Sequence, residues 1–133
     1  MKKIGSKRLA DSTGDLGDID VLIFDTKKKR IIAIECKDLA IARTPYEISS
    51  EIINLFRGDE ANRSIVERHR RRVQWLREHL DATLAWVGLT RTGKWKVEGL
   101  IVVDEPLFTP YMQQSPIKVL TLDELMRAQS SNK

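Results

Sequence analysis

The chain has 133 residues, one cysteine and a formal net charge of +4, which suits a single domain that buries about two thirds of its unfolded surface. A lone cysteine excludes an internal disulfide framework and a cysteine-based zinc site, and it fits a reducing compartment. No apolar run approaches the ~20 residues of a membrane span, and no apolar signal region follows Met1-Lys2-Lys3. We therefore expect a cytoplasmic protein with no membrane contact.

Two apolar segments of strand length come first in the chain, at residues 17–23 and 32–37. The polar stretch 25–30 joins them, which predicts an antiparallel hairpin. Both segments also carry charged residues, and an ionised group inside a sheet costs several kcal/mol unless it is paired or binds a metal. These charges therefore require a structural or functional explanation.

The predicted hairpin brings three charged residues together. With residues 27 and 28 at the tip, opposed residues have numbers that sum to 55, so Asp20 faces Glu35 at a Cβ distance of ~5 Å. Lys37 lies two residues beyond Glu35 and shares its face of the strand. A register shifted by one residue would turn the set over, although Glu35 and Lys37 would remain partners.

Two carboxylates and an ammonium group at one point suit metal-assisted phosphodiester hydrolysis. Carboxylates, a backbone carbonyl and waters are the oxygen ligands that Mg²⁺ prefers, and a neighbouring lysine can act on the attacking water or on the developing charge. The alternative is a structural ion pair of Lys37 with Glu35 or Asp20 at a strand end. The acid opposed across the hairpin favours the metal site.

The runs Gly17-Asp18-Ile19-Asp20 and Ile34-Glu35-Cys36-Lys37 resemble the PD-(D/E)XK motif of the restriction-endonuclease-like nucleases. The resemblance implies that Asp20, Glu35 and Lys37 are catalytic. It also implies that Asp20, Glu35 and the backbone carbonyl of Cys36 hold Mg²⁺ or Mn²⁺, and that the substrate is DNA.

The resemblance covers residues 3–105 and has two departures. Ile19 stands where the motif name has proline, as in many members. In this fold a helix precedes the first strand and often carries another acid, but too few residues precede Asp18 to form it. The chain thus looks like a fragment or a truncated gene product that lacks the first helix. Asp18, two residues before Asp20, is a candidate auxiliary acid, although a solvent-facing strand start explains it equally well.

Two helices are expected after the motif. Thr44 and Glu47 form a capping box for the first, which ends at Gly58. The second spans about residues 59–80, with His69 on its apolar stripe as a core histidine.

Two more strands, at 83–89 and 97–103, should follow. The end of the chain predicts a short turn at 108–111, an edge strand at 117–120, a helix over 121–127 and a disordered tail at 129–133. We therefore expect an α/β fold with a mixed central sheet, helices on both faces and a restriction-endonuclease-like core, in one nuclease-like domain over residues 1–128.

Basic residues gather in three clusters, a distribution typical of phosphate binding, although a solvated surface explains any one of them. Arginines beside an aromatic ring can also grip phosphates and stack bases. The candidate nucleic-acid contacts are Lys28, Lys29, Arg43, Arg68, Arg71, Arg72 and Trp75.

The function predicted from sequence is that of a Mg²⁺-dependent deoxyribonuclease, with DNA and either a second copy or a missing N-terminal domain as partners. One alternative is a catalytically inactive nucleic-acid-binding or assembly module of the same fold. Another is an ordinary α/β domain with a strand-end ion pair and a protein partner. The absence of a Gly-rich phosphate loop and of a Ser/His/Asp arrangement argues against an NTPase and a triad hydrolase.

Overall fold

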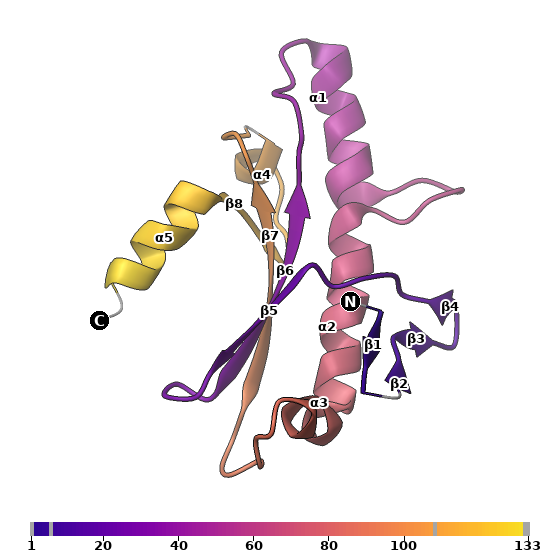
Figure 1. Ribbon diagram of the computed structural model, residues 1–133. Coiled ribbons are helices and arrows are strands. Elements are labelled where there is room, and N and C mark those ends of the chain that lie inside the picture. Colours follow the sequence, from indigo (N-terminus) through magenta and orange to yellow (C-terminus); the bar gives the residue numbers. More distant parts are fainter. Residues whose placement is uncertain (1, 6, 108, 132–133) are drawn as a thin grey trace.

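A four-stranded mixed sheet forms the centre of the molecule in the computed structural model, which describes residues 2–5, 7–107 and 109–131 (Figure 1). Strand β5 (Val21–Asp25) pairs antiparallel with β6 (Arg30–Lys37). Strand β7 (Lys96–Val103) runs parallel to β6, and β8 (Lys118–Thr121) runs parallel to β7. The order β5-β6-β7-β8 leaves the sheet open at both edges.

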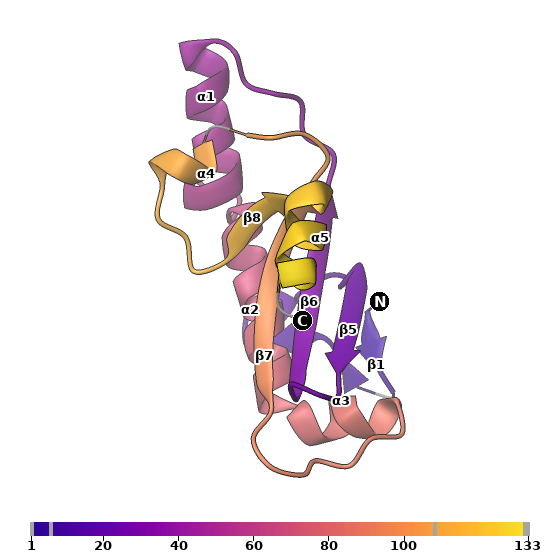
Figure 2. The same cartoon turned by 90° about the vertical axis from the view of Figure 1, so that its left-hand side faces the viewer.

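Helices cover both faces of this sheet, as the sequence predicts. Helix α2 (Ile65–Glu78) lies on one face and α5 (Leu122–Ser131) on the other (Figures 1 and 2). Side chains of β6 alternate between the two: Ala33 belongs to the large core under α2, whereas Ile34 packs in a smaller cluster with Leu125 of α5. This alternation is the period of two that a strand imposes.

The first predicted helix is confirmed as α1 (Pro45–Ile52), which continues as a π-helical turn, η1 (Ile53–Arg57). The Thr44 hydroxyl accepts a hydrogen bond from the Glu47 N–H at 3.1 Å, so the predicted cap is present. Gly58, at a φ of 71°, ends the turn, because a left-handed backbone conformation favours glycine. Helix α1 extends past the end of β6 (Figure 1).

The predicted strand at residues 83–89 is wrong, because Leu80–Trp86 form a helix, α3. Its buried residues Leu80, Thr83 and Leu84 have helical spacing, and a short apolar run does not by itself separate strand from helix. The preceding helix is also shorter than expected. It begins after Ser64, whose hydroxyl accepts from the Glu67 N–H, and residues 59–64 form a loop.

The segment before β5 contains no helix within residues 2–5 and 7–20. It forms two small antiparallel hairpins, β1 (Lys3–Ile4) with β2 (Lys7–Arg8), and β3 (Ala10–Asp11) with β4 (Gly14–Asp15). Side chains at four positions anchor this segment in the core: Ile4, Leu9, Leu16 and Ile19.

The end of the chain follows the prediction closely. A short helix, α4 (Thr109–Met112), precedes β8, and the Thr121 hydroxyl accepts from the Glu124 N–H at the start of α5. Helix α5 continues to Ser131, into residues that the sequence assigns to a tail; Phe108 and residues 132–133 lie outside the described residues. No helix in the described part of the chain is long and apolar enough to cross a membrane.

Candidate active site

The β5–β6 hairpin has the predicted register. Val21 pairs with Ile34 and Asp25 with Arg30, so paired residue numbers sum to 55. Asp20 comes directly before the first of these pairs, and its Oδ2 accepts a hydrogen bond from the Cys36 backbone N–H at 2.9 Å. The Asp20 carboxylate therefore lies across the hairpin at the position of residues 35 and 36.

Glu35 and Lys37 lie together on the face of β6 that α2 covers. The Glu35 Oε1 and Lys37 Nζ atoms are 3.4 Å apart; the Glu35 side chain is 9% exposed and that of Lys37 is 34% exposed. The pKa of the Cys36 thiol is raised by partial burial and by the charges of Asp20 and Glu35. The hairpin thus places the Asp20 carboxylate on the backbone of Cys36, the residue between Glu35 and Lys37.

A buried arginine completes the cluster. Arg72 of α2 donates from Nη1 to the Glu35 Oε2 at 2.9 Å and from Nε to the Leu16 carbonyl at 2.7 Å. The structure gives no support to the predicted contact of Arg72 with nucleic acid, because this residue is 8% exposed and its Nε and Nη1 groups both donate inside the protein. Its position three residues after His69 on the buried stripe of α2 is the sequence feature that indicates this inward direction.

His69 is confirmed as a core histidine. It is fully buried, with Nε2 2.8 Å from the Ala33 carbonyl oxygen, so Nε2 carries the proton. The Nδ1 atom has no hydrogen-bond partner among the described residues. Burial, reinforced by the positive charge of Arg72, lowers the pKa of His69, whereas its hydrogen bond to Ala33 and the nearby carboxylates raise it less.

The donor set fits a hard divalent cation. Asp20 and Glu35 offer carboxylate oxygens, and Cys36 offers a carbonyl; Mg²⁺ is commonly bound by one or two carboxylates with several waters. The raised pKa of Cys36 keeps its thiol protonated, which disfavours a soft thiolate site. Among the described residues, no group of three or more His, Cys, Asp and Glu side chains is arranged to hold a metal.

A second acidic pair lies where β6 and β7 end. Lys37 is in register with Val103, so Asp38 and Asp104 are neighbours. The hydrogen bond to Asp104 and its charge raise the pKa of Asp38, while the same hydrogen bond lowers the pKa of Asp104. The sequence interpretation of Asp104 as strand termination missed this pair, because it depends on parallel pairing between distant segments.

The other predicted nucleic-acid contacts are scattered. Trp75 is 3% exposed and stacks on His79, so its predicted exposure is wrong. Lys28 and Lys29 lie at the hairpin tip, before Arg30, which is itself seven residues along β6 from Lys37 and therefore roughly 23 Å away.

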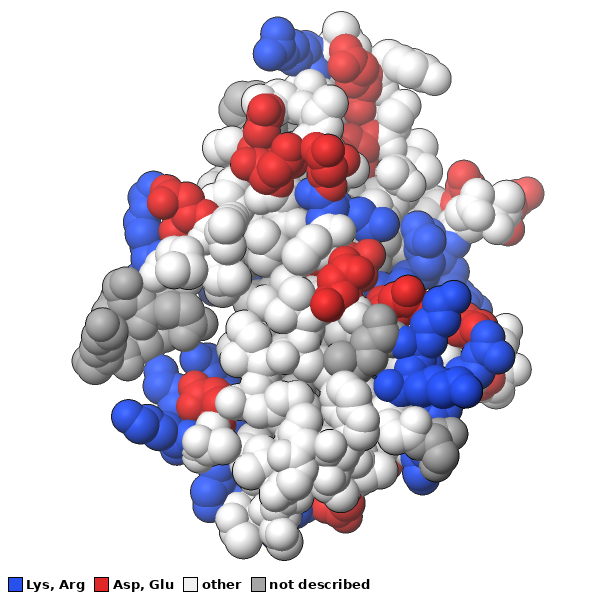
Figure 3. All heavy atoms as spheres, viewed as in Figure 1, with Lys and Arg blue, Asp and Glu red and all other residues white. Residues whose placement is uncertain are grey.

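The other three predicted basic contacts differ in their surroundings. Arg43 is exposed in the loop after β6, whereas Arg71 forms ion pairs with Glu67 and Asp11. Arg68 is exposed and has no ion pair among the described residues. Basic side chains gather where α2 meets β3 and β4 (Figure 3), and contact with nucleic acid there stays a prediction.

A comparison with protein families matched residues 4–103, 100 of the 133 residues, to a family described as anti-phage protein Upx-like. The matched segment includes Asp20, Glu35, Lys37 and Arg72. No curated protein and no solved structure matched the chain.

Proposed function

This chain belongs to the Upx-like family of anti-phage proteins, and we propose that it acts in phage defence as a metal-dependent nuclease that hydrolyses phosphodiester bonds in DNA. The supporting observation is the cluster of Asp20, Glu35 and Lys37 at one end of the β5–β6 hairpin. The mixed sheet with helices on both faces is compatible with the restriction-endonuclease-like core that the sequence motif implies.

Each residue of the cluster has a distinct proposed role. Asp20, Glu35 and the carbonyl of Cys36 would hold Mg²⁺ or Mn²⁺, which supplies Lewis-acid activation of water and neutralises charge on the phosphate. Lys37, partly exposed beside Glu35, orients the attacking water or donates to the phosphate oxygen that gains charge. Arg72 fixes the Glu35 carboxylate from beneath and is a positioning residue.

The proposal is tested by cleavage of supercoiled plasmid with Mg²⁺, with Mn²⁺ and with EDTA. Asp20→Asn, Glu35→Gln and Lys37→Ala should each lower the metal-dependent rate by about 10²-fold or more, the usual contribution of a group that acts on the reacting atoms. Matched controls outside the cluster are Asp81→Asn, Glu98→Gln and Lys96→Ala, which should cleave at the parental rate. Equal activity of Lys37→Ala and Lys96→Ala would contradict the role of Lys37.

One observation favours the second candidate, a binding module without catalysis. Both oxygens of Glu35 are engaged by cations of the protein itself, Lys37 and Arg72, so the protein supplies the counter-charges of this carboxylate. Salt-dependent DNA binding, combined with no metal binding and no cleavage, would support that candidate.

A further inference from the structure

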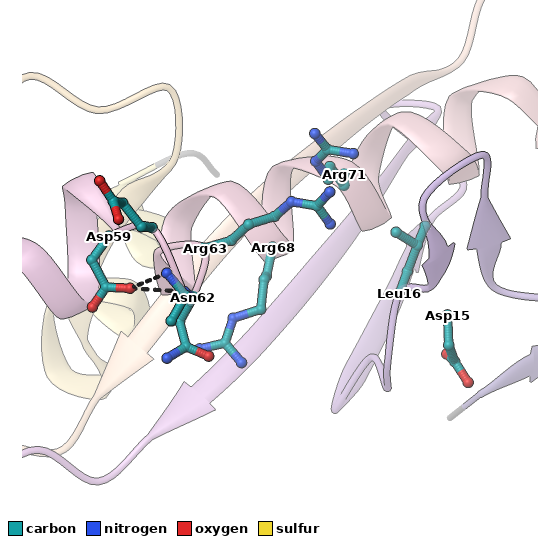
Figure 4. A pocket seen from close by; sticks show the side chains of 9 residues that line it. Asp15, Leu16, Asp59, Asn62, Arg63, Arg68 and Arg71 are labelled. Atoms are coloured by element: carbon teal, nitrogen blue, oxygen red, sulfur yellow. Dashed lines mark hydrogen bonds between the residues drawn. The ribbon is translucent and has the colours of Figure 1, made fainter.

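A cleft of about 420 Å³ opens between the loop at residues 59–62 and the segment after β4 (Figure 4). It lies beside the cluster of Asp20, Glu35, Lys37 and Arg72, here called the Glu35 cluster. Three guanidinium groups line it, from Arg63, Arg68 and Arg71. All three come from the start of α2 or the residue just before its cap, so the backbone of α2 fixes them on one side of the cleft.

Two of these arginines have no acidic partner among the residues that the structure describes. Arg71 is held by ion pairs with Glu67 at 3.1 Å and Asp11 at 3.2 Å. Arg63 and Arg68 are exposed and make no side-chain hydrogen bond or ion pair within the described residues. Like charges placed together without counter-ions repel each other, so the cleft has a surplus of donors suited to an anion.

The acidic residues around the cleft do little to cancel this charge. Asp15 accepts from Arg8 at 2.6 Å and from the Gly17 N–H at 2.9 Å. Asp59 accepts from the N–H groups of residues 61 and 62, which shapes the loop. Glu60 is the lining acid that has no such contact among the described residues.

The cleft is linked to the proposed active site through Leu16 and Arg72. Leu16 lines the cleft, and its carbonyl accepts the hydrogen bond from Arg72, which also binds Glu35. Arg68 precedes Arg72 by four residues, about one helical turn or ~6 Å along the axis. An anion at Arg68 would therefore lie about one turn of α2 away from the residue that holds Glu35.

We infer that Arg63 and Arg68 bind a phosphate of the DNA backbone that flanks the phosphate at the active site. The identity of the polymer rests on the proposed function. Arg71 contributes less, because its charge is neutralised, and the ion pairs of Arg71 and Arg8 fix the β3–β4 hairpin as the second wall of the cleft.

The experiment is fluorescence anisotropy of a labelled 20-nucleotide DNA, duplex and single-stranded, in EDTA so that no cleavage occurs. We compare the parent with Arg63→Gln/Arg68→Gln. The matched control is Arg91→Gln/Arg127→Gln, which removes the same formal charge from exposed sites outside the cleft. Because the Arg63 and Arg68 side chains have no partner among the described residues, thermal unfolding of the first variant should be unchanged.

The cleft variant should bind about tenfold more weakly at 0.1 M salt. The slope of log K against log salt should fall by about 1.8 on duplex DNA, or by about 1.4 on a single strand, as expected for two lost phosphate contacts. Equal affinities and slopes for the cleft and control variants would overturn the inference. So would binding of inorganic phosphate at these arginines that the 20-nucleotide DNA does not displace, since the cleft would then be a small-anion site.

The result of the DNA-binding experiment can be distinguished from the result of the plasmid-cleavage experiment that tests the proposed function. If no metal supports plasmid cleavage but the cleft variant still loses affinity, the nuclease proposal fails and the phosphate cleft stands. If cleavage depends on Glu35 but the Arg63→Gln/Arg68→Gln variant binds DNA as tightly as the parent, the phosphate cleft fails and the nuclease proposal stands.

Discussion

At the residue scale, the Glu35–Arg72 ion pair is the most deeply buried one in the part of the chain that the structure describes. Both side chains are 9% exposed, and removing one partner of a buried pair leaves the other charge uncompensated. Lys37 offers Glu35 a second but more distant cation, 3.4 Å away. The pair therefore links the stability of α2 against β6 to the position of the proposed metal ligand.

Arg72→Gln should lower the free energy of unfolding by about 3 kcal/mol in urea titration. Arg70→Gln is the matched control on the same helix, where the partner Glu67 is more exposed; it should cost less than about 1 kcal/mol. The double variant Glu35→Gln/Arg72→Gln should cost less than the sum of its single variants. Additive losses would show that the two residues are not coupled.

His69 makes stability depend on pH. Its folded-state pKa lies below the ordinary value of 6.5 because burial disfavours the imidazolium. The unfolded chain therefore takes up a proton first as the pH falls, and the contribution of His69 to stability, present above about pH 6.5, is lost as the pH decreases. The free energy of unfolding should fall more steeply between pH 7 and 5 in the parent than in His69→Gln.

The difference in slope isolates His69 from the carboxylates, which titrate in both proteins. Between pH 7.5 and 8.5, where His69 is neutral in both the folded and unfolded states, the two proteins should show parallel curves. Parallel curves at acid pH as well would contradict this assignment.

The residues of the candidate site differ in how far sequence alone predicts them. Asp20, Glu35 and Lys37 could be placed because a period of two and one turn fix a hairpin register. Arg72 was only partly predictable: its spacing from His69 indicates the inward face of α2, but no local pattern shows that it pairs with Glu35, 37 residues away.

At the element scale, the strands could be predicted from local sequence patterns, whereas the helix α3 could not. Residues 83–89 are as apolar as a buried strand, and only the packed neighbours at the end of the sheet select the helical spacing of Leu80, Thr83 and Leu84. Strand β7 was predictable because its run is longer and rich in β-branched residues.

Gly99 sets how closely α2 approaches β7. A Cβ atom added at this position would lie 2.6 Å from Cγ2 of Val73 and 3.1 Å from Cδ1 of Ile117. Gly99→Ala should therefore lower the free energy of unfolding by about 1–3 kcal/mol through overpacking.

Val73→Ala removes the nearest clashing atom, so it should cost less in the Gly99→Ala background than in the parent. Gly93→Ala is an unsuitable control because its φ is 80°, so a side chain there strains the backbone whatever space surrounds it. If Val73→Ala had the same cost in both backgrounds, the close approach would not be the cause.

At the scale of the whole molecule, the N-terminal hairpins occupy the place in the chain where the nuclease resemblance implies a helix. The side chains of Leu9, Leu16 and Ile19 are buried and anchor this segment in the core. The Leu16 carbonyl accepts a hydrogen bond from Arg72. The segment thus supports the Glu35 cluster by backbone contact, whereas Asp18 is exposed and its auxiliary role stays a prediction. This arrangement was not predictable, since two-residue strands leave no periodic pattern.

The cluster also links metal binding to the stability of the whole fold. An ion bound to the folded state alone stabilises it by RT ln(1 + [L]/Kd), about 1.4 kcal/mol at a tenfold excess over Kd. Since Arg72 holds the Glu35 Oε2 at 2.9 Å and Lys37 is 3.4 Å from Oε1, a metal at Oε1 competes with Lys37. Mn²⁺ should therefore raise the melting temperature of the parent.

Three variants separate this competition from other effects in the same melting experiment. Glu35→Gln should abolish the Mn²⁺-induced rise and Asp81→Asn should retain it. Lys37→Ala should show a rise at least as large as the parent's, because it removes a cation that competes for Oε1, even though it loses cleavage. A smaller rise in Lys37→Ala would mean that Lys37 helps to bind the metal, whereas equal rises in all variants would place the metal outside the cluster.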